Sequence, residues 1–195
     1  GIERVTGSLI FADDMKSDDE LEGRVLFAAY PHARILSIDV TEAESMPGVA
    51  KVLTHKDIPG NKYFSETEYP QQILAIDKVR YIGDPVAVVF AETEKQAYEA
   101  MEHIHVEYEV LPVLSSIEAA IAPEAVRVHD EWPSLYSTQK VHKGNCSKGF
   151  AQCDYIVESD FETKAIDHAV MELCASHAEI GADGRLTLYG TCQSY

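Results

Sequence analysis

Few side chains in this sequence stand at the spacings that catalysis or metal binding requires. His103 and His105 lie two residues apart, but at the end of a predicted helix and the start of a predicted strand, on positions that alternate out of the core. We therefore expect no metal pair there. The four cysteines include no Cys-x-x-Cys pair and no histidine at zinc-finger spacing, which predicts reduced thiols without a metal. His32, at the start of another predicted strand, is expected to form a structural hydrogen bond.

The common motifs of nucleotide binding and acyl transfer are also missing. No serine lies in a Gly-x-Ser-x-Gly elbow, and the sequence has neither a phosphate-binding glycine loop nor Gly-x-Gly-x-x-Gly. Serine hydrolase, P-loop NTPase and Rossmann interpretations therefore lose their support. The chain has 33 acidic and 16 basic residues and a formal charge of −17, which repels a phosphate backbone. Its acidic stretches lack the spacing of a calcium loop, so we expect a solvated acidic surface and no nucleic-acid partner.

Length and hydropathy predict a packed, soluble protein. The chain has 195 residues and 46% hydrophobic residues, enough for one substantial domain and part of another. No apolar run reaches the roughly 18 residues that a membrane span needs, and the N-terminal Gly-Ile-Glu-Arg-Val has no signal-peptide core. We expect a cytoplasmic location.

The stretch from residue 77 to residue 112 predicts a strand, a helix and a second strand. The apolar, β-branched run from Val86 to Ala91 predicts a strand buried on both faces. Thr93 and Gln96 fit a capping box. Four apolar residues then share one face at helical spacing: Ala97, Ala100, Met101 and Ile104. Apolar and polar residues alternate from His105 to Val110, so this order predicts a parallel pair joined by a right-handed crossover.

The first half of the chain predicts the same order once more. Strands are expected at Leu9–Ala12, Gly23–Tyr30, Ile35–Val40 and Val49–Thr54. A capping box that begins at Thr41 predicts a short helix between the last two of these strands. A Pro-Gly pair is expected to end this helix. Two strand-helix-strand units predict an α/β (α+β) fold.

The amino-acid sequences of these segments are similar to those of one known protein family. The run Val-Arg-Tyr-Ile-Gly-Asp-Pro-Val-Ala at 79–87, then Val-Glu-Tyr-Glu at 106–109 and Leu-Pro at 111–112, resembles the a/b hammerhead domain of aldehyde oxidase and xanthine dehydrogenase. That domain opens the molybdenum-binding subunit of the molybdenum hydroxylases. The resemblance implies a hammerhead domain with two strand-helix-strand units.

The same resemblance divides the chain into three parts. Residues 1–122 would form the a/b hammerhead domain, with a short helix at its end, and residues 123–148 would form a linker. Residues 149–195 would form the first strands of the molybdenum-cofactor-binding domain. Here we expect a strand at Tyr155–Thr163, a second strand at Ala169–Ile180, and a hairpin turn at Asp183-Gly184. The chain stops after the returning strand, so we expect a fragment of a longer subunit.

Gln193 is the candidate cofactor-binding residue, and its role is implied by the resemblance. In the family a hairpin strand ends in a segment with serine or threonine and a glutamine, and the run from Arg185 to Gln193 looks like that segment. The family's glutamine donates an amide hydrogen bond to an oxygen on molybdenum. A carboxamide suits this role because it is neutral and can donate. Glu172 also matches the family, and we interpret it as structural, with its carboxylate capping backbone donors.

The resemblance implies a xanthine dehydrogenase or aldehyde oxidase type enzyme. Such enzymes hydroxylate a purine, N-heterocycle or aldehyde carbon with water as the oxygen source. They carry a molybdenum-pterin cofactor, and iron-sulfur clusters and FAD lie on partner subunits or domains. The implied partners are the remainder of the catalytic subunit, the iron-sulfur and FAD parts, and a small-molecule substrate, in an oligomer.

The catalytic glutamate and the glycine-rich segments around the pterin would lie outside these residues. We therefore expect no catalytic residue, no metal ligand and no bound cofactor in this chain alone. The alternative is a non-catalytic hammerhead module used for subunit assembly.

Overall fold

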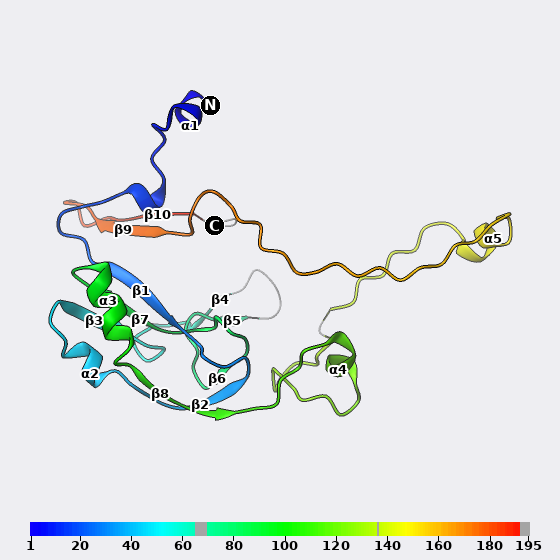
Figure 1. Ribbon diagram of the computed structural model, residues 1–195, viewed down its shortest axis with the longest axis horizontal. Helices are drawn as coiled ribbons and strands as arrows, with labels where there is room; N and C mark the ends of the chain where they lie inside the picture. Colours follow the sequence, from blue (N-terminus) through cyan, green and yellow to red (C-terminus); the bar gives the residue numbers. More distant parts are fainter. Residues whose placement is uncertain (65–69, 136, 192–195) are drawn as a thin grey trace. The chain divides into compact units, whose positions relative to one another are not determined.

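The computed structural model describes residues 1–64, 70–135 and 137–191 (Figure 1). Their contacts form two compact units. The sheet unit is Glu20–Gln139, and the hairpin unit combines Gly1–Asp19 with Lys140–Tyr195. The domain limits expected from the sequence (1–122, 123–148 and 149–195) stay a prediction. No helix among the described residues is long and apolar enough to cross a membrane.

The first sheet of the sheet unit has the strand order β1-β7-β3 (Figure 1). Strand β7 (Pro85–Ala91) lies in the middle and pairs antiparallel with β1 (Glu22–Phe27) and β3 (Val49–Leu53). Four of its residues have no exposed surface: Val86, Ala87, Val89 and Ala91. The prediction of an interior strand at this position is confirmed.

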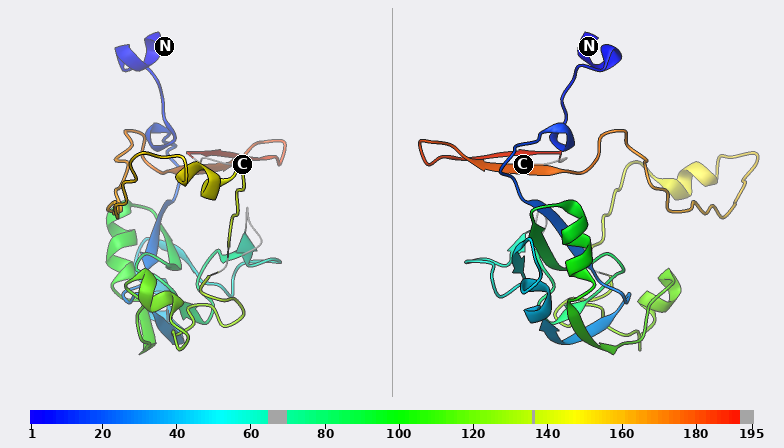
Figure 2. Two further views of the ribbon diagram at one scale, coloured as in Figure 1. Left: turned by 90° about the vertical axis from the view of Figure 1, so that its right-hand side faces the viewer. Right: turned by 60° about the vertical axis from the view of Figure 1, so that its left-hand side comes forward.

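Helix α3 (Glu94–Met101) packs on this sheet (Figure 2). Thr93 is its N-cap, because the Thr93 hydroxyl oxygen accepts the Gln96 backbone N–H at 3.3 Å. The Gln96 side-chain oxygen accepts a hydrogen bond from the same hydroxyl at 2.7 Å. In a capping box it would accept from the Thr93 backbone N–H instead. Ala97 and Ala100 are fully buried and Ile104 is 8% exposed, so the predicted apolar face is the packed face.

The second sheet has the order β6-β2-β8, and every pairing in it is antiparallel. It consists of β6 (Lys78–Val79), β2 (Ala33–Asp39) and β8 (His105–Val110). The predicted parallel pair is therefore wrong, because α3 leads from β7 in one sheet to β8 in the other. The order of strand, helix and strand along the chain favoured a crossover within one sheet. In the structure, β8 packs its side chains with those of β2 and therefore joins the second sheet.

The rest of the sheet unit consists of short elements. Helix α2 (Thr41–Glu44) joins β2 to β3, so both predicted strand-helix-strand orders are present in a mixed α/β fold. Strands β4 (Tyr63–Phe64) and β5 (Gln71–Gln72) form an antiparallel pair. Helix α4 (Ile117–Ile121) begins after Ser116, whose hydroxyl accepts the Ala119 N–H at 3.1 Å.

In the described part of the hairpin unit, β9 (Ser176–Ile180) and β10 (Leu186–Gly190) form an antiparallel pair. The predicted turn between them is confirmed: Gly184 has φ +77°, and the Asp183 carboxylate accepts the Arg185 N–H at 3.0 Å. The remaining elements are short helices: α1 (Ile2–Thr6), the 3-10 helix η1 (Ala12–Asp14) and α5 (Cys146–Phe150).

Three strand predictions in this unit need correction. Leu9–Ala12 forms no strand and leads into η1, and Tyr155–Thr163 contains no strand. Of Ala169–Ile180, only the last five residues are strand. Alternating apolar residues favour a strand only when a partner strand accepts their backbone hydrogen bonds, and the described residues supply none for Tyr155–Thr163.

Candidate functional site

The segment that leads to Gln193 is held at the end of the β9–β10 hairpin. The Thr191 N–H donates to the Ala175 carbonyl at 3.0 Å, which continues the hairpin ladder beyond Gly190. The Thr191 hydroxyl donates to the Glu172 carboxylate at 3.1 Å. The chain is thus bonded on both its backbone and its side chain two residues before Gln193. Gln193 itself lies outside the described residues, so its predicted role stays a prediction.

Glu172 acts through a different partner from the one expected. It is half-buried, and its carboxylate accepts from the Thr191 side chain, whereas the sequence led us to expect backbone donors. This bond joins the segment before β9 to the residue after β10. Glu172 is therefore bonded to the strand end that precedes Gln193, and its structural role stays a prediction.

His103 and His105 converge on a single carboxylate, that of Glu42 in α2. His103 Nδ1 lies 2.7 Å and His105 Nε2 lies 3.2 Å from the two Glu42 oxygens. These hydrogen bonds, His103 first, lower the pKa of Glu42. All three side chains are exposed, and in the described part of the chain no group of three or more His, Cys, Asp or Glu could hold a metal ion.

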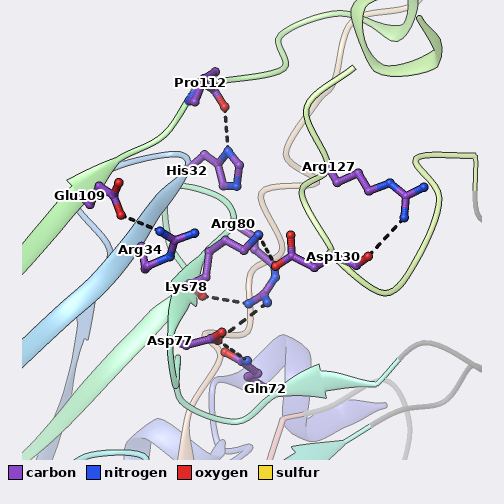
Figure 3. Close-up of polar contacts among 10 residues, drawn as sticks. All are labelled: His32, Arg34, Gln72, Asp77, Lys78, Arg80, Glu109, Pro112, Arg127 and Asp130. Carbon is purple, nitrogen blue, oxygen red and sulfur yellow. Dashed lines mark hydrogen bonds and ion pairs between the residues drawn. The ribbon is translucent and has the colours of Figure 1, made fainter. Parts of the chain in front are cut away.

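His32 is a buried hydrogen-bonding residue, as predicted. It is 2% exposed, and its Nδ1 donates to the Pro112 carbonyl at 2.7 Å (Figure 3). The bond joins the start of β2 to the residue that follows β8 and Leu111. Because β2 and β8 are antiparallel, with Ala33 opposite Val110, the bond closes this pair of strands at one end of the second sheet.

An ion pair between a buried lysine and an exposed aspartate holds part of the predicted linker on the sheet unit (Figure 3). The Lys78 side chain, on β6, is 5% exposed, and its ammonium group lies 3.0 Å from the Asp130 carboxylate. The hydrogen bond from Lys78 lowers the pKa of Asp130. A buried ammonium requires such a partner. Residues 123–139 consequently belong to the compact sheet unit.

A cavity of about 420 Å³ lies beside this ion pair. Its aromatic wall is formed by Tyr63, Phe64, Tyr81, His129 and Trp132, with the rings of the last two stacked at 4.6 Å. Volume and aromatic lining are typical of ligand-binding or docking sites.

Polar residues also line this cavity: Gln71, Gln72, Asp77, Arg80, Asp84 and Glu131. Asp84 is 6% exposed, and burial raises its pKa although its carboxylate accepts the Arg80 N–H at 3.0 Å. This cavity could not be predicted from the sequence, because both stacked rings, His129 and Trp132, lie in the predicted linker. One signal was available: Trp132 is the single tryptophan, and a tryptophan in a polar segment indicates packing.

Two antiparallel sheets with α3 between β7 and β8 place the sheet unit in the mixed α/β class. The chain belongs to the aldehyde oxidase and xanthine dehydrogenase a/b hammerhead domain family, whose model matches residues 6–112. A second model, the molybdopterin cofactor-binding domain, matches residues 128–195. These matches confirm the family resemblance and the order of the two domains.

Curated relatives match over nearly the whole chain. A probable xanthine dehydrogenase subunit of Bacillus subtilis is 40% identical over 100% of this chain and 26% of its own length. The nicotinate dehydrogenase large molybdopterin subunit of Eubacterium barkeri is 32% identical over 99% of this chain and 45% of its own. The chain thus spans less than half the length of these relatives.

Solved structures agree with the fold. The aldehyde oxidoreductase of Desulfovibrio gigas matches with a TM-score of 0.84 and 32% identity, over 97% of this chain and 22% of that one. Quinoline 2-oxidoreductase of Pseudomonas putida matches with a TM-score of 0.85 and 29% identity, over 98% of this chain and 26% of that one.

The match to the molybdopterin cofactor-binding domain model indicates a molybdenum-pterin group, and the contact that Gln193 would make with it stays a prediction. The hairpin ends in a bonded Thr191, and a neutral carboxamide follows two residues later in the sequence. A carboxamide can donate to an electron-rich oxygen without adding charge. One such donor can orient a cofactor, and further contacts must hold it.

Proposed function

We propose that this chain is part of the catalytic subunit of a molybdenum hydroxylase of the xanthine dehydrogenase and aldehyde oxidase type. The reaction is the oxidative hydroxylation of a purine, N-heterocycle or aldehyde carbon, with water as the oxygen source. The observation that carries this proposal is the order of the two family matches, hammerhead at 6–112 and molybdopterin-binding at 128–195, in one chain. The names of the relatives support the substrate classes.

The alternative, a hammerhead module that serves assembly alone, has weaker support. A pure assembly module would need no molybdopterin-binding segment, whereas the match at 128–195 includes the hairpin and Gln193. The relatives also align over both regions together.

In this proposal the hairpin presents Gln193 to the cofactor. Gln193 would donate its amide N–H to an oxygen of the molybdenum group, and the group supplies the oxidative hydroxylation chemistry when bound. Glu172 and Thr191 hold the strand end, so they are positioning residues. The catalytic glutamate and the glycine-rich pterin contacts would come from the remainder of the subunit.

Electron transfer requires further groups. Iron-sulfur clusters and FAD on partner subunits or domains would accept the electrons, within an oligomer. The location proposed for the assembly is the cytoplasm.

A substrate panel tests the proposal. The complete protein that carries this chain, produced with its partners, is assayed with xanthine, nicotinate, quinoline and an aromatic aldehyde and a dye as electron acceptor. Turnover of at least one compound, with label from ¹⁸O-water in the product, is the expected result. A fully metal-loaded protein that turns over none of these classes would contradict the proposal.

A further inference from the structure

The proposed reaction uses no residue of the cavity beside the Lys78–Asp130 pair, and the aromatic wall of this cavity is exposed in this chain. Tyr63 is 40% exposed, Phe64 is 54% exposed and Tyr81 is 55% exposed, while Trp132 is half-buried. Ile82, next to this wall, is 70% exposed. Exposed aromatic rings gathered around one hollow are typical of the anchor positions in protein interfaces.

The charge that the cavity offers to a partner is negative. Asp77 and Glu131 are exposed at the cavity. Within the described residues, the Asp77 carboxylate uses Oδ1 for its contacts with Gln72 at 3.4 Å and Arg80 at 4.0 Å (Figure 3). Arg80 is turned inward: its side chain is 15% exposed, and one guanidinium N–H donates to the Lys78 carbonyl at 2.8 Å. A partner therefore meets Asp77 Oδ2 and the Glu131 carboxylate.

A guanidinium group matches this combination of rings and carboxylates. It is planar, stacks on aromatic faces and donates to carboxylates in a fork geometry. The chain holds one of its own arginines in the same way: the Arg24 guanidinium lies 5.7 Å from the Tyr98 ring centroid and 2.9 Å from the Glu94 carboxylate. The cavity offers the same chemistry to a cation from another chain.

We propose that this cavity is a docking site for an arginine side chain carried by a peptide segment of another protein chain. The guanidinium lies between the Tyr81 and Trp132 rings and pairs with Asp77 and Glu131. Apolar neighbours of the arginine cover Phe64 and Ile82. The occupant is a peptide because the exposed rings extend beyond the area that one guanidinium covers. The peptide is basic because residues 20–139 carry 20 acidic and nine basic residues.

The test uses Trp132 as its reporter, because it is the single tryptophan of the chain. The site needs neither Gln193 nor a cofactor, so the experiment runs on the 195-residue chain. A capped Arg-Gly-Arg-Gly peptide is titrated while tryptophan emission is recorded, beside Lys-Gly-Lys-Gly and Glu-Gly-Glu-Gly. The arginine peptide should shift the emission and bind more tightly than the lysine peptide, the acidic peptide should cause no change, and added salt should weaken binding.

Matched variants separate the cavity from the rest of the acidic surface. Asp77→Asn and Glu131→Gln should each raise the Kd about threefold, and Tyr81→Ala should raise it further while Tyr81→Phe keeps binding. Glu99→Gln and Tyr98→Ala, which change a carboxylate and a ring outside the cavity, should leave the Kd unchanged. Two results would overturn the proposal: no peptide-dependent change in Trp132 emission, or the same Kd in the Asp77→Asn/Glu131→Gln double variant as in Glu99→Gln.

Discussion

At the residue scale, Gln193 is the position where a single substitution is expected to change turnover most specifically. In the complete subunit, Gln193→Glu replaces an amide donor by an anion facing an electron-rich oxygen. The change should cost roughly 2 to 4 kcal/mol in the transition state, or roughly a 30- to 1,000-fold loss of turnover. Gln193→Ala should be milder because it adds no charge. Steady-state rates and molybdenum content check both variants, and unchanged turnover at full metal loading would make Gln193 a surface residue.

The Lys78–Asp130 pair predicts an asymmetry between its two partners. Asp130→Asn leaves a buried ammonium without an anion and should lower the free energy of unfolding by about 1 to 2 kcal/mol. Lys78→Met should cost less, because the Asp130 side chain is 72% exposed and returns to water. The exposed Arg34–Glu109 pair is the control, and Glu109→Gln should cost under about 0.5 kcal/mol. Urea unfolding of the variants measures all three, and equal losses for the two partners would contradict the burial argument.

Single residues could be predicted where local chemistry decides. Thr93 was identified as an N-cap from its type and spacing, and the burial of His32 makes it the structural hydrogen-bonder expected of it. Lys78 and Asp130 could not be paired from the sequence, because no periodic signal relates two residues that lie so far apart along the chain. The same limit applies to the cavity, whose wall draws on separate segments of the chain.

At the element scale, the contact of α2 with the corner between α3 and β8 depends on pH. Hydrogen bonds from His103 and His105 lower the pKa of Glu42 in the folded state. The stability from this contact is therefore present above the ordinary pKa of a glutamate, about 4.3, and is lost as the pH falls through the lower folded-state value. Glu42→Gln should remove this acid dependence and leave the rest of the pH profile in place.

Unfolding midpoints in urea, recorded between about pH 6 and pH 3, measure this effect. Glu107→Gln is the matched control, because the Glu107 carboxylate meets the Ser37 hydroxyl at 3.4 Å and no histidine. The difference between wild type and Glu42→Gln should shrink as the pH falls. A constant difference over this range would show that the histidine contacts do not stabilise the fold.

Elements were predicted well where burial and periodicity agree, as in β7 and α3. The partner of a strand was predicted poorly: β8 was expected beside β7, and it pairs with β2. Which sheet a strand joins depends on contacts between residues that are distant in the sequence. One example is the pair Tyr30 and Tyr108, whose ring centroids lie 5.3 Å apart. Period-2 alternation at Tyr155–Thr163 predicted a strand for the same local reason, without a partner to pair with among the described residues.

At the scale of the whole molecule, the chain alone should contain neither molybdenum nor flavin. One carboxamide supplies too few contacts to hold a large anionic pterin cofactor in water, whatever its orientation. Metal analysis and an absorption spectrum of the purified chain measure this, and a colourless protein is expected. Stoichiometric molybdenum in that sample would mean that the cofactor contacts are more complete than the chain's donor set indicates.

The strand order of the sheet unit also governs how the chain can be made. β1 pairs with β7, and β2 pairs with β8. In both pairings the second strand is synthesised long after the first. The first sheet cannot close before Ala91 leaves the ribosome, and the second not before Val110 does. Meanwhile β1 and β2 present open strand edges to other nascent chains, which slows folding and favours misassembly. These unpaired strands of the nascent chain are therefore the segments in which misassembly is expected to begin.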